Sequence, residues 1–454
     1  MAAPVANSSG QLFQLFRSGE VRTRNDIQAL TGLSRSTLAF RLDGLLRAGY
    51  LLEDGVTSEP GRGRPSIRLR VNDFQTTVLV ADLGATHGRV AVCTAAGDVL
   101  AERMIESAIG SGPRVVLDRV HKVLEGLLRQ TGRDRTTLRG VGVGVPGPVD
   151  HQTGRIARSI SMPGWDDYPV ADHIHDLYGV PVAVDNDANL LGLGEQAAIY
   201  PDTHLLLFVK VGTGIGASIV VDGRLLRGRD AAEGDIGHAK IVGGQEVCSC
   251  GEVGCLAASA SGRAMVRDLN RLGHQLRTSR DVVTLVRRGD PDAVRIITDA
   301  GRALGTVLST AVSLLNPEVV VIGGDIAHAH ERLLAGIRET LLSLTQPLAT
   351  AHLTVAPSQL GDHAGTAGAA LPSGRRSLAL APWMLSSSAG PTGRSQSCPT
   401  RPVVRCRPSA DRCRCAPGVE IDQRDRRGVQ FAWRRALLAH LEDRHPQRLA
   451  QRAG

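Results

Sequence analysis

The stretch TVLVADLGATHGRVAVC (77–93) consists of two apolar runs joined by a turn that contains aspartate, glycine and threonine. Apolar runs that are rich in β-branched residues and closed by glycine are typical of buried strands. Four more follow: RGVGVGVPGPVD (139–150), VPVAVDNDANLLGLGE (180–195), HLLLFVKVGTGIGASIVVDG (204–223) and NPEVVVIGGD (316–325). Helical periodicity appears between them, as in VVLDRVHKVLEGLLRQ, so the pattern predicts an α/β body.

Three of the turns that close these strands are suited to phosphate. In the first, a carboxylate and a hydroxyl stand beside backbone N–H groups, which favours a phosphate bridged by a metal ion. GTGIG between two apolar strands and GGD after VVVI offer further N–H groups. The candidate phosphate or ATP residues are Asp82, Gly84, Thr86, Gly212, Thr213, Gly214, Gly323 and Gly324. A single glycine-rich turn indicates little, but three in this order predict a phosphate site.

Length and charge limit the class of protein. A chain of 454 residues exceeds one core, which predicts two or three domains. No apolar run approaches the roughly 18 residues of a membrane span, and MAAPVANSSG is unlike a secretory signal, so we expect a cytoplasmic protein without a membrane partner. The net charge of +8 divides into +3 for residues 1–73, −5 for 74–370 and +10 for 371–454. The excess positive charge therefore belongs to the two ends.

Residues 1–73 have the pattern of a winged helix-turn-helix. QLFQLFRS (11–18) shows helical spacing, and a glycine turn separates the next helix from SRSTLAFRLDGLLRAG (34–49). Two strand-like runs then surround a basic loop, which resembles a wing whose Arg-Gly-Arg-Pro hook enters the minor groove. The candidate DNA contacts are Ser36, Thr37, Phe40, Arg41, Arg62 and Arg64. The alternative interpretation is a small helical hairpin without a DNA role.

Capping signals delimit the two central helices of this segment. Thr23, with Asp26 three residues later, predicts an N-cap, and Ser34 predicts the next one. The Thr-Gly pair at 31 and 32 predicts the end of the first helix. Leucines of the second helix share one face at helical spacing: Leu38, Leu42, Leu45 and Leu46.

Six short motifs, taken in order along the chain, resemble the successive motifs of the repressor, open-reading-frame and kinase (ROK) family. They are DLGATH, GVPGPV, DNDAN, GTGIG, DIGH and CSCGEVGCLA. The resemblance covers roughly residues 10–370. It implies a two-lobed, actin-like and sugar-kinase-like body with a ribonuclease H-like fold over residues 77–370, preceded by the winged helix-turn-helix of residues 1–73. This arrangement is that of the family's transcriptional repressors, whereas its sugar kinases usually lack the winged helix.

The resemblance also implies roles for individual residues. Asp187 matches the general base that takes a proton from the sugar hydroxyl as it attacks the γ-phosphate. The implied ligand-binding residues are Gly147, Asn186, Asp187, Asp235 and His238. From the residues alone, DNDAN has a simpler interpretation, in which it ends a strand and caps a helix. Asp235 and Ala257 stand where the kinases have sugar-binding glutamates, which argues against ordinary hexose phosphorylation.

Three cysteines and a histidine gather in a short segment. His238, Cys248, Cys250 and Cys255 supply four nitrogen and sulfur ligands, which suit tetrahedral Zn²⁺ and leave no open position for an activated water. Their spacing is not that of a DNA-reading finger. We therefore expect a structural zinc that braces the loop; the alternative is a group of buried thiols without a metal.

Residues 371–454 are rich in serine, proline, arginine and glycine, and we expect this tail to be disordered. A frameshifted translation, a basic extension that assists DNA binding and a cysteine-rich metal module all fit its composition.

The leading hypothesis is a ROK transcriptional repressor that binds operator DNA and responds to a sugar or sugar-derived effector. The rival is an ATP-dependent sugar kinase that uses Mg²⁺, and a third hypothesis combines both activities. The family resemblance further implies a homo-oligomer, either a dimer or a tetramer.

Overall fold

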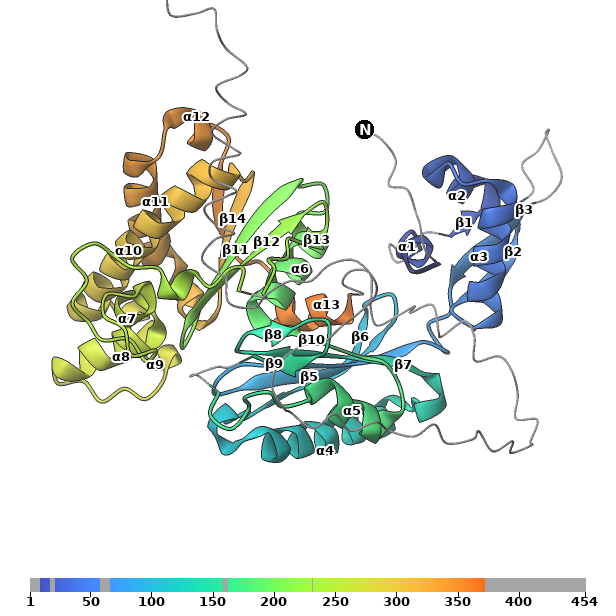
Figure 1. Ribbon diagram of the computed structural model, residues 1–454, viewed down its shortest axis with the longest axis horizontal. Helices are drawn as coiled ribbons and strands as arrows, with labels where there is room; N and C mark the ends of the chain where they lie inside the picture. Colours follow the sequence, from blue (N-terminus) through green and yellow to red (C-terminus); the bar gives the residue numbers. More distant parts are fainter. Residues whose placement is uncertain (1–8, 17–20, 58–65, 158–161, 231, 372–454) are drawn as a thin grey trace, which may run out of the picture. The chain divides into compact units, whose positions relative to one another are not determined.

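The computed structural model describes residues 9–16, 21–57, 66–157, 162–230 and 232–371 (Figure 1). The wing residues Arg62 and Arg64 lie outside this part, as does the tail that we expect to be disordered, from residue 372 onward. Among the described residues, no helix is both long and apolar enough to span a membrane.

The N-terminal elements follow the predicted order of two central helices and two wing strands. They are α1 (Ser9–Gln14), β1 (Arg22–Thr23), α2 (Arg24–Thr31), α3 (Arg35–Arg47), β2 (Leu51–Thr57) and β3 (Ser66–Val71). The strands pair antiparallel in the order β1-β3-β2. Apolar side chains from all three helices and from the wing strands form the core, including Leu12, Phe13, Phe16, Ile27, Leu51 and Leu69.

Local capping sets the ends of α2 and α3. Thr23 and Asp26 form the predicted capping box, and the Ser34 side chain accepts a hydrogen bond from the backbone N–H of Thr37. Gly32 ends α2 with a φ of 65°, a left-handed conformation that glycine adopts without a Cβ clash. The predicted apolar face of α3 is buried at three positions and partly buried at a fourth: Leu38, Leu42 and Leu45, then Leu46.

The first sheet of the body has the strand order β10-β7-β4-β5-β6. Its elements are β4 (Thr77–Leu83), β5 (Gly88–Thr94), β6 (Val99–Ile105), α4 (Pro113–Thr131), β7 (Leu138–Val145), α5 (Val170–Tyr178) and β10 (Val182–Asn186), with a two-stranded ribbon of β8 (Val149–Asp150) and β9 (Arg155–Ile156). Helices α4 and α5 cover one face, seen below the sheet in Figure 1. Because β4, β7 and β10 are parallel, the turns that follow them meet at one edge.

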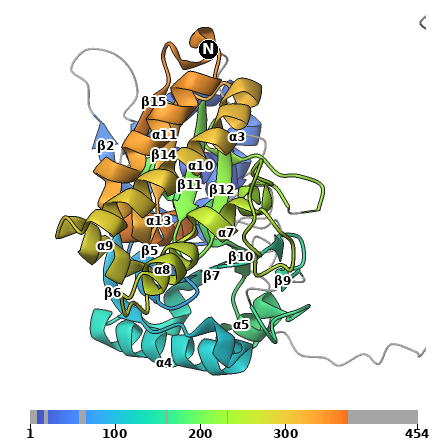
Figure 2. The same ribbon diagram turned by 90° about the vertical axis from the view of Figure 1, so that its left-hand side faces the viewer.

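The second sheet has the order β13-β12-β11-β14-β15. Its strands are β11 (Leu205–Val211), β12 (Ile215–Val221), β13 (Arg224–Leu225), β14 (Val319–Gly323) and β15 (Thr354–Pro357). The helices that accompany it are α7 (Leu256–Ala260), α8 (Gly262–Arg271), α9 (Ser279–Arg287), α10 (Pro291–Leu315), α11 (His330–Leu344) and α12 (Pro347–Thr350). Figure 2 shows α10 and α11 layered over β11 and β14. The predicted α/β fold is confirmed.

Two further helices connect the sheets: α6 (Asp187–Ile199) packs on β11 and β12, and α13 (Ala364–Ala370) packs on β4, β5 and β7. The two helices also pack against each other. Their backbones approach so closely that a Cβ added at Gly194 would overlap the carbonyl oxygen of Ala364, and one added at Gly368 would overlap that of Leu190. Glycine is therefore needed at this crossing.

Candidate functional site

The turns after β4, β7, β10 and β11 line one cavity of about 960 Å³. Most predicted site residues of the body lie on its wall: Asp82, Gly84, Thr86, Gly147, Asn186, Asp187, Gly212, Thr213, Gly214, Asp235, His238 and Gly324. Gly323 does not; it is buried behind Gly324, where an added Cβ would overlap the Phe208 ring. The structure thus brings the predicted phosphate turns and the predicted sugar residues together.

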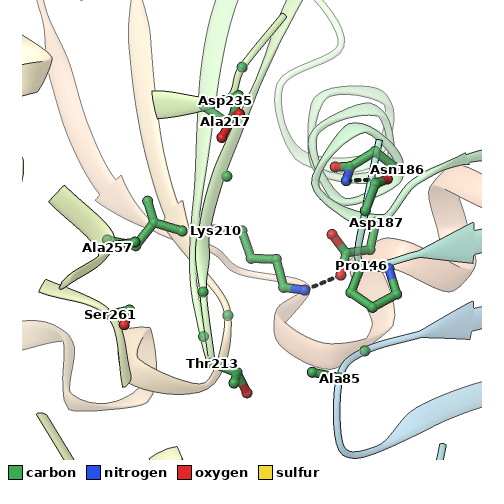
Figure 3. A pocket seen from close by; sticks show the side chains of 18 of the residues that line it. Ala85, Pro146, Asn186, Asp187, Lys210, Thr213, Ala217, Asp235, Ala257 and Ser261 are labelled. Atoms are coloured by element: carbon green, nitrogen blue, oxygen red, sulfur yellow. Dashed lines mark hydrogen bonds and ion pairs between the residues drawn. The ribbon is translucent and has the colours of Figure 1, made fainter. Parts of the chain in front are cut away.

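Asn186 organises the end of the cavity where the sugar-binding residues are predicted. Its Nδ2 donates to the carbonyl oxygen of Gly147 at 3.0 Å, and its Oδ1 accepts from the backbone N–H of Ala188 at 2.9 Å, which caps α6. Asn186 therefore caps α6, as the simpler interpretation of DNDAN expects. That interpretation does not account for Asp187, the first residue of α6, whose carboxylate faces the cavity (Figure 3).

Two basic side chains, one from β11 and one from the loop after β13, pair with carboxylates where β10 passes into α6. Lys210, near the end of β11, donates to Asp187 across the cavity (Figure 3). Arg227, just after β13, binds Asp185 through both terminal nitrogens and also lies 3.4 Å from a carboxylate oxygen of Glu233. Burial alone would lower the pKa of Lys210, but the adjacent Asp187 carboxylate, together with Asp82 and Asp325, outweighs burial and raises the pKa overall. Lys210 is therefore an ammonium ion.

Asp82 provides the carboxylate of the first phosphate turn. Burial, reinforced by the negative charge of Asp187, raises the pKa of Asp82 to about 7. The main chain of α13 lies against it, since a Cβ added at Gly365 would overlap the Asp82 carboxyl group. Within the phosphate turns, the N–H of Gly84 donates to His87 at 2.8 Å and that of Gly212 to Gly214 at 2.9 Å. These two amides stabilise the turns themselves.

The predicted zinc ligands form one cluster beside the cavity, with their ligand atoms within 4.8 Å of one another. The Sγ atoms of Cys250 and Cys255 are 3.7 Å apart, and the Sγ atom of Cys248 is 3.7 Å from Nδ1 of His238. Tetrahedral zinc with Zn–S bonds of about 2.3 Å requires sulfur separations of about 3.8 Å. The donor set and its spacing therefore fit a metal ion.

His238 links this cluster to the cavity. While its Nδ1 faces Cys248, its Nε2 lies 3.9 Å from the carboxylate of Asp235, whose side chain is 58% exposed. Ala257 also lines the cavity, from the start of α7, where its methyl group offers no hydrogen-bond acceptor. The two departures from the kinase pattern thus lie on the wall of one cavity.

Helix α3 presents the predicted DNA-contacting face. Ser36 is exposed, Phe40 is 74% exposed, and Thr37 and Arg41 are partly buried. An ion pair of 2.9 Å between Arg24 and Asp43 fastens α2 to α3. The leucines on the opposite face of α3 are buried in the core, so the packing of the helix holds its exposed side chains in place.

A family model described as the ROK family matches residues 78–372. The chain belongs to the ROK family. A putative xylose repressor of Caldicellulosiruptor sp. (strain Rt8B.4) is 30% identical over 75% of this chain and 89% of its own length. The crystal structure of a ROK transcriptional regulator, a homolog of the Escherichia coli MLC protein, matches 80% of this chain and 94% of its own, with 26% identity and a TM-score of 0.68.

A ROK glucokinase from Streptomyces griseus, solved in complex with glucose and AMPPNP, has a TM-score of 0.57 and 26% identity. It covers 65% of this chain and 98% of its own. The match to the ROK regulator therefore extends over more of this chain than the match to the kinase, which is no longer than the ROK body alone.

Sequence reasoning overlooked the basic partners in the ROK cavity. Lys210 interrupts the otherwise apolar strand LLLFVKV (205–211) two residues before Gly212 of the glycine turn, and it is one of three lysines in the chain. A charged residue in a buried strand requires a partner of opposite charge, so the position of Lys210 in the sequence could have predicted an ion pair. Arg227 gave no comparable signal, because it lies in a loop and arginine is abundant in this chain.

Proposed function

We propose that the chain is a ROK transcriptional repressor that binds operator DNA and holds a sugar or sugar-derived effector in the cavity. The observation that carries the proposal is the exposed face of α3, supported by a packed leucine core, ahead of a ROK body. The similarity to a ROK regulator over 80% of the chain supports it. The net charge of +3 in residues 1–73 favours contact with the phosphate backbone.

In the proposed complex, two copies of the chain bind an inverted repeat. Helix α3 lies in the major groove, where Ser36, Thr37 and Arg41 reach hydrogen-bonding base edges and Phe40 contacts a thymine methyl. Arg62 and Arg64 enter a flanking A·T-rich minor groove. The predicted domain boundaries, 1–73 for DNA and 77–370 for the effector, are part of this proposal.

Fluorescence anisotropy on DNA from the protein's own promoter region tests the DNA part. We expect Arg41→Ala to weaken specific binding by about 1–3 kcal/mol, the value of one good base contact. Arg295→Ala, which removes an exposed arginine of α10, is the matched control and should leave binding unchanged. Unchanged specific binding by Arg41→Ala and Arg64→Ala at moderate salt would contradict this docking.

The proposal includes a structural Zn²⁺ on His238, Cys248, Cys250 and Cys255. Metal analysis should find about one zinc per chain, held by the four-ligand cluster. Cys250→Ser should lose it, whereas Cys93→Ala, in β5, should keep it. A protein truncated after residue 370 separates this site from the tail cysteines. Full zinc content in Cys250→Ser would contradict the ligand set.

The second candidate function is an ATP-dependent sugar kinase that uses Mg²⁺. The retained Asp187 and phosphate turns favour it, as does the similarity to a ROK glucokinase. A coupled ATPase assay over a panel of hexoses and amino sugars decides between the two. We expect negligible turnover; a rate above about 1 s⁻¹, the lower end of ordinary enzymes, would establish the kinase.

A further inference from the structure

Lys210 lies between the acid at the start of α6 and the glycine turn after β11. Its Nζ donates to Asp187, and its stem lies against the turn, since a Cβ at Gly212 would be 3.7 Å from the Lys210 Cε. Figure 3 shows the side chain crossing the cavity, with Thr213 and Ala85 on the turns nearby. A positive charge is thus held at the junction of the sugar end and the phosphate turns.

Phosphoryl transfer requires two things at this junction: a carboxylate ready to accept the proton of the attacking hydroxyl, and a divalent cation that bridges the phosphates. The ion pair opposes both. The Lys210 ammonium donates to one Asp187 carboxylate oxygen, so that oxygen is already occupied and is not free to accept the hydroxyl proton. It also places a fixed cation among the acidic groups Asp82, Asp187 and Asp325, which line the same cavity and attract Lys210 electrostatically.

The charge of the cavity wall points to the kind of ligand. Eight acidic side chains line it, against five of lysine or arginine. A nucleotide would need a divalent cation to enter such a wall, and a sugar phosphate would meet net repulsion. A neutral sugar meets neither cost, because its hydroxyls can accept from the ammonium and donate to the carboxylates.

We propose that Lys210 is a built-in cation that takes the place of a divalent metal ion, so that the cavity binds a neutral, unphosphorylated sugar without phosphoryl transfer. The cation part stands on the Lys210 geometry alone. The sugar part rests on the proposed function, which puts an effector in this cavity.

The cation part is tested with Mn²⁺ alone, followed by electron paramagnetic resonance on the zinc-replete full chain. Lys210→Met keeps the stem and removes the charge, which opens the carboxylates to a metal ion. We expect it to bind Mn²⁺ at least about tenfold more tightly than the wild type, a difference of about 1.4 kcal/mol. Lys122→Met, which removes an exposed lysine of α4, is the matched control and should behave as the wild type.

The double variant Lys210→Met with Asp187→Asn removes both charges of the pair, so it guards against misfolding from an unpaired buried carboxylate. It should fold and lose the gained Mn²⁺ site. Equal Mn²⁺ affinity in the wild type and Lys210→Met would overturn the cation part. Retention of the gained site in the double variant would overturn it too.

The sugar part is tested by thermal shift of the wild type with glucose, xylose and N-acetylglucosamine, each beside its terminal phosphate ester. We expect at least one neutral sugar to stabilise the protein, and its ester to bind at least about tenfold more weakly. Tighter binding of an ester would overturn this part and make Lys210 a phosphate anchor. If no sugar binds, the proposed effector fails, whereas the Mn²⁺ result still decides the role of Lys210.

Discussion

Helices α3 and α6 are both 13 residues long, and each begins after a polar N-cap, Ser34 in one and Asn186 in the other. Their surroundings are opposite. Helix α3 buries one leucine face and leaves the other open, whereas the first ten residues of α6 are all buried. The same local device therefore serves two arrangements: α3 presents side chains outward on an open face, where we propose that DNA binds, and α6 aims a single carboxylate into a cavity.

The largest expected effect comes from disturbing the packing of α6. In Gly194→Ala the new Cβ of α6 overlaps the carbonyl oxygen of Ala364 in α13. To relieve the overlap, one of these two helices must shift away from the other. We expect a loss of about 3 kcal/mol or more in the free energy of unfolding, measured by chemical denaturation.

The control is Gly126→Ala in α4, where the added Cβ has nothing within 4 Å. That change should stabilise the protein by about 0.5–1 kcal/mol, because alanine is the better helix former. If Gly194→Ala were equally harmless, the close crossing of α6 and α13 would be wrong.

The next effect concerns Asp82, which faces the first residue of α6. Its pKa is about 7 in the folded protein against an ordinary value of 3.8, so between these values the folded state holds a proton that the unfolded chain has lost. Stability from this group is therefore greatest at low pH and is lost as the pH rises toward 7.

Asp82→Asn is neutral at every pH and removes this cost. We expect its gain in unfolding free energy over the wild type to grow by about 2 kcal/mol between pH 4 and pH 8, less than the full shift because solvent reaches the carboxyl. Asp202→Asn, which changes an exposed acid in the turn after α6, serves as the control and should show no comparable growth of its gain. A gain that shrinks with pH would reverse the assigned direction.

On the open face of α3, function and stability should separate. Phe40 is 74% exposed and packs on no core, so Phe40→Ala should change the unfolding free energy by less than about 0.5 kcal/mol. Its affinity for the operator should fall by about 1–2 kcal/mol through the lost apolar contact with DNA. Anisotropy measures the operator affinity and denaturation the unfolding free energy of the same sample. If Phe40→Ala lowered both, Phe40 would contribute to the fold and not only to DNA contact.

The difference between α3 and α6 also marks what the sequence could predict. Leucine spacing and the Ser34 cap act within a few residues, so the start and the buried face of α3 followed from local rules. The order of glycine turns indicated which strand ends meet in the cavity. The pairs Lys210–Asp187 and Arg227–Asp185 join residues 23 and 42 positions apart on different structural elements. No local rule orients such side chains across a cavity, so they required the structure.

The smallest effect is the difference between the two caps. Ser34→Ala removes exposed hydrogen bonds only: the one from the N–H of Thr37 and those with the hydroxyls of Ser36 and Thr37. It should cost about 1 kcal/mol, since water can replace the lost partners. Asn186→Ala removes two bonds in a partly buried place, which leaves the N–H of Ala188 and the carbonyl of Gly147 without these partners. It should cost about 1 kcal/mol more, because a desolvated polar group is expensive to leave unpaired.

Asn186→Asp keeps the side-chain acceptor and loses only the donor. Its free energy of unfolding should therefore fall between that of the wild type and that of Asn186→Ala. Equal costs for Ser34→Ala and Asn186→Ala would show that water reaches the start of α6, and the contrast between an open helix and an enclosed one would not extend to their caps.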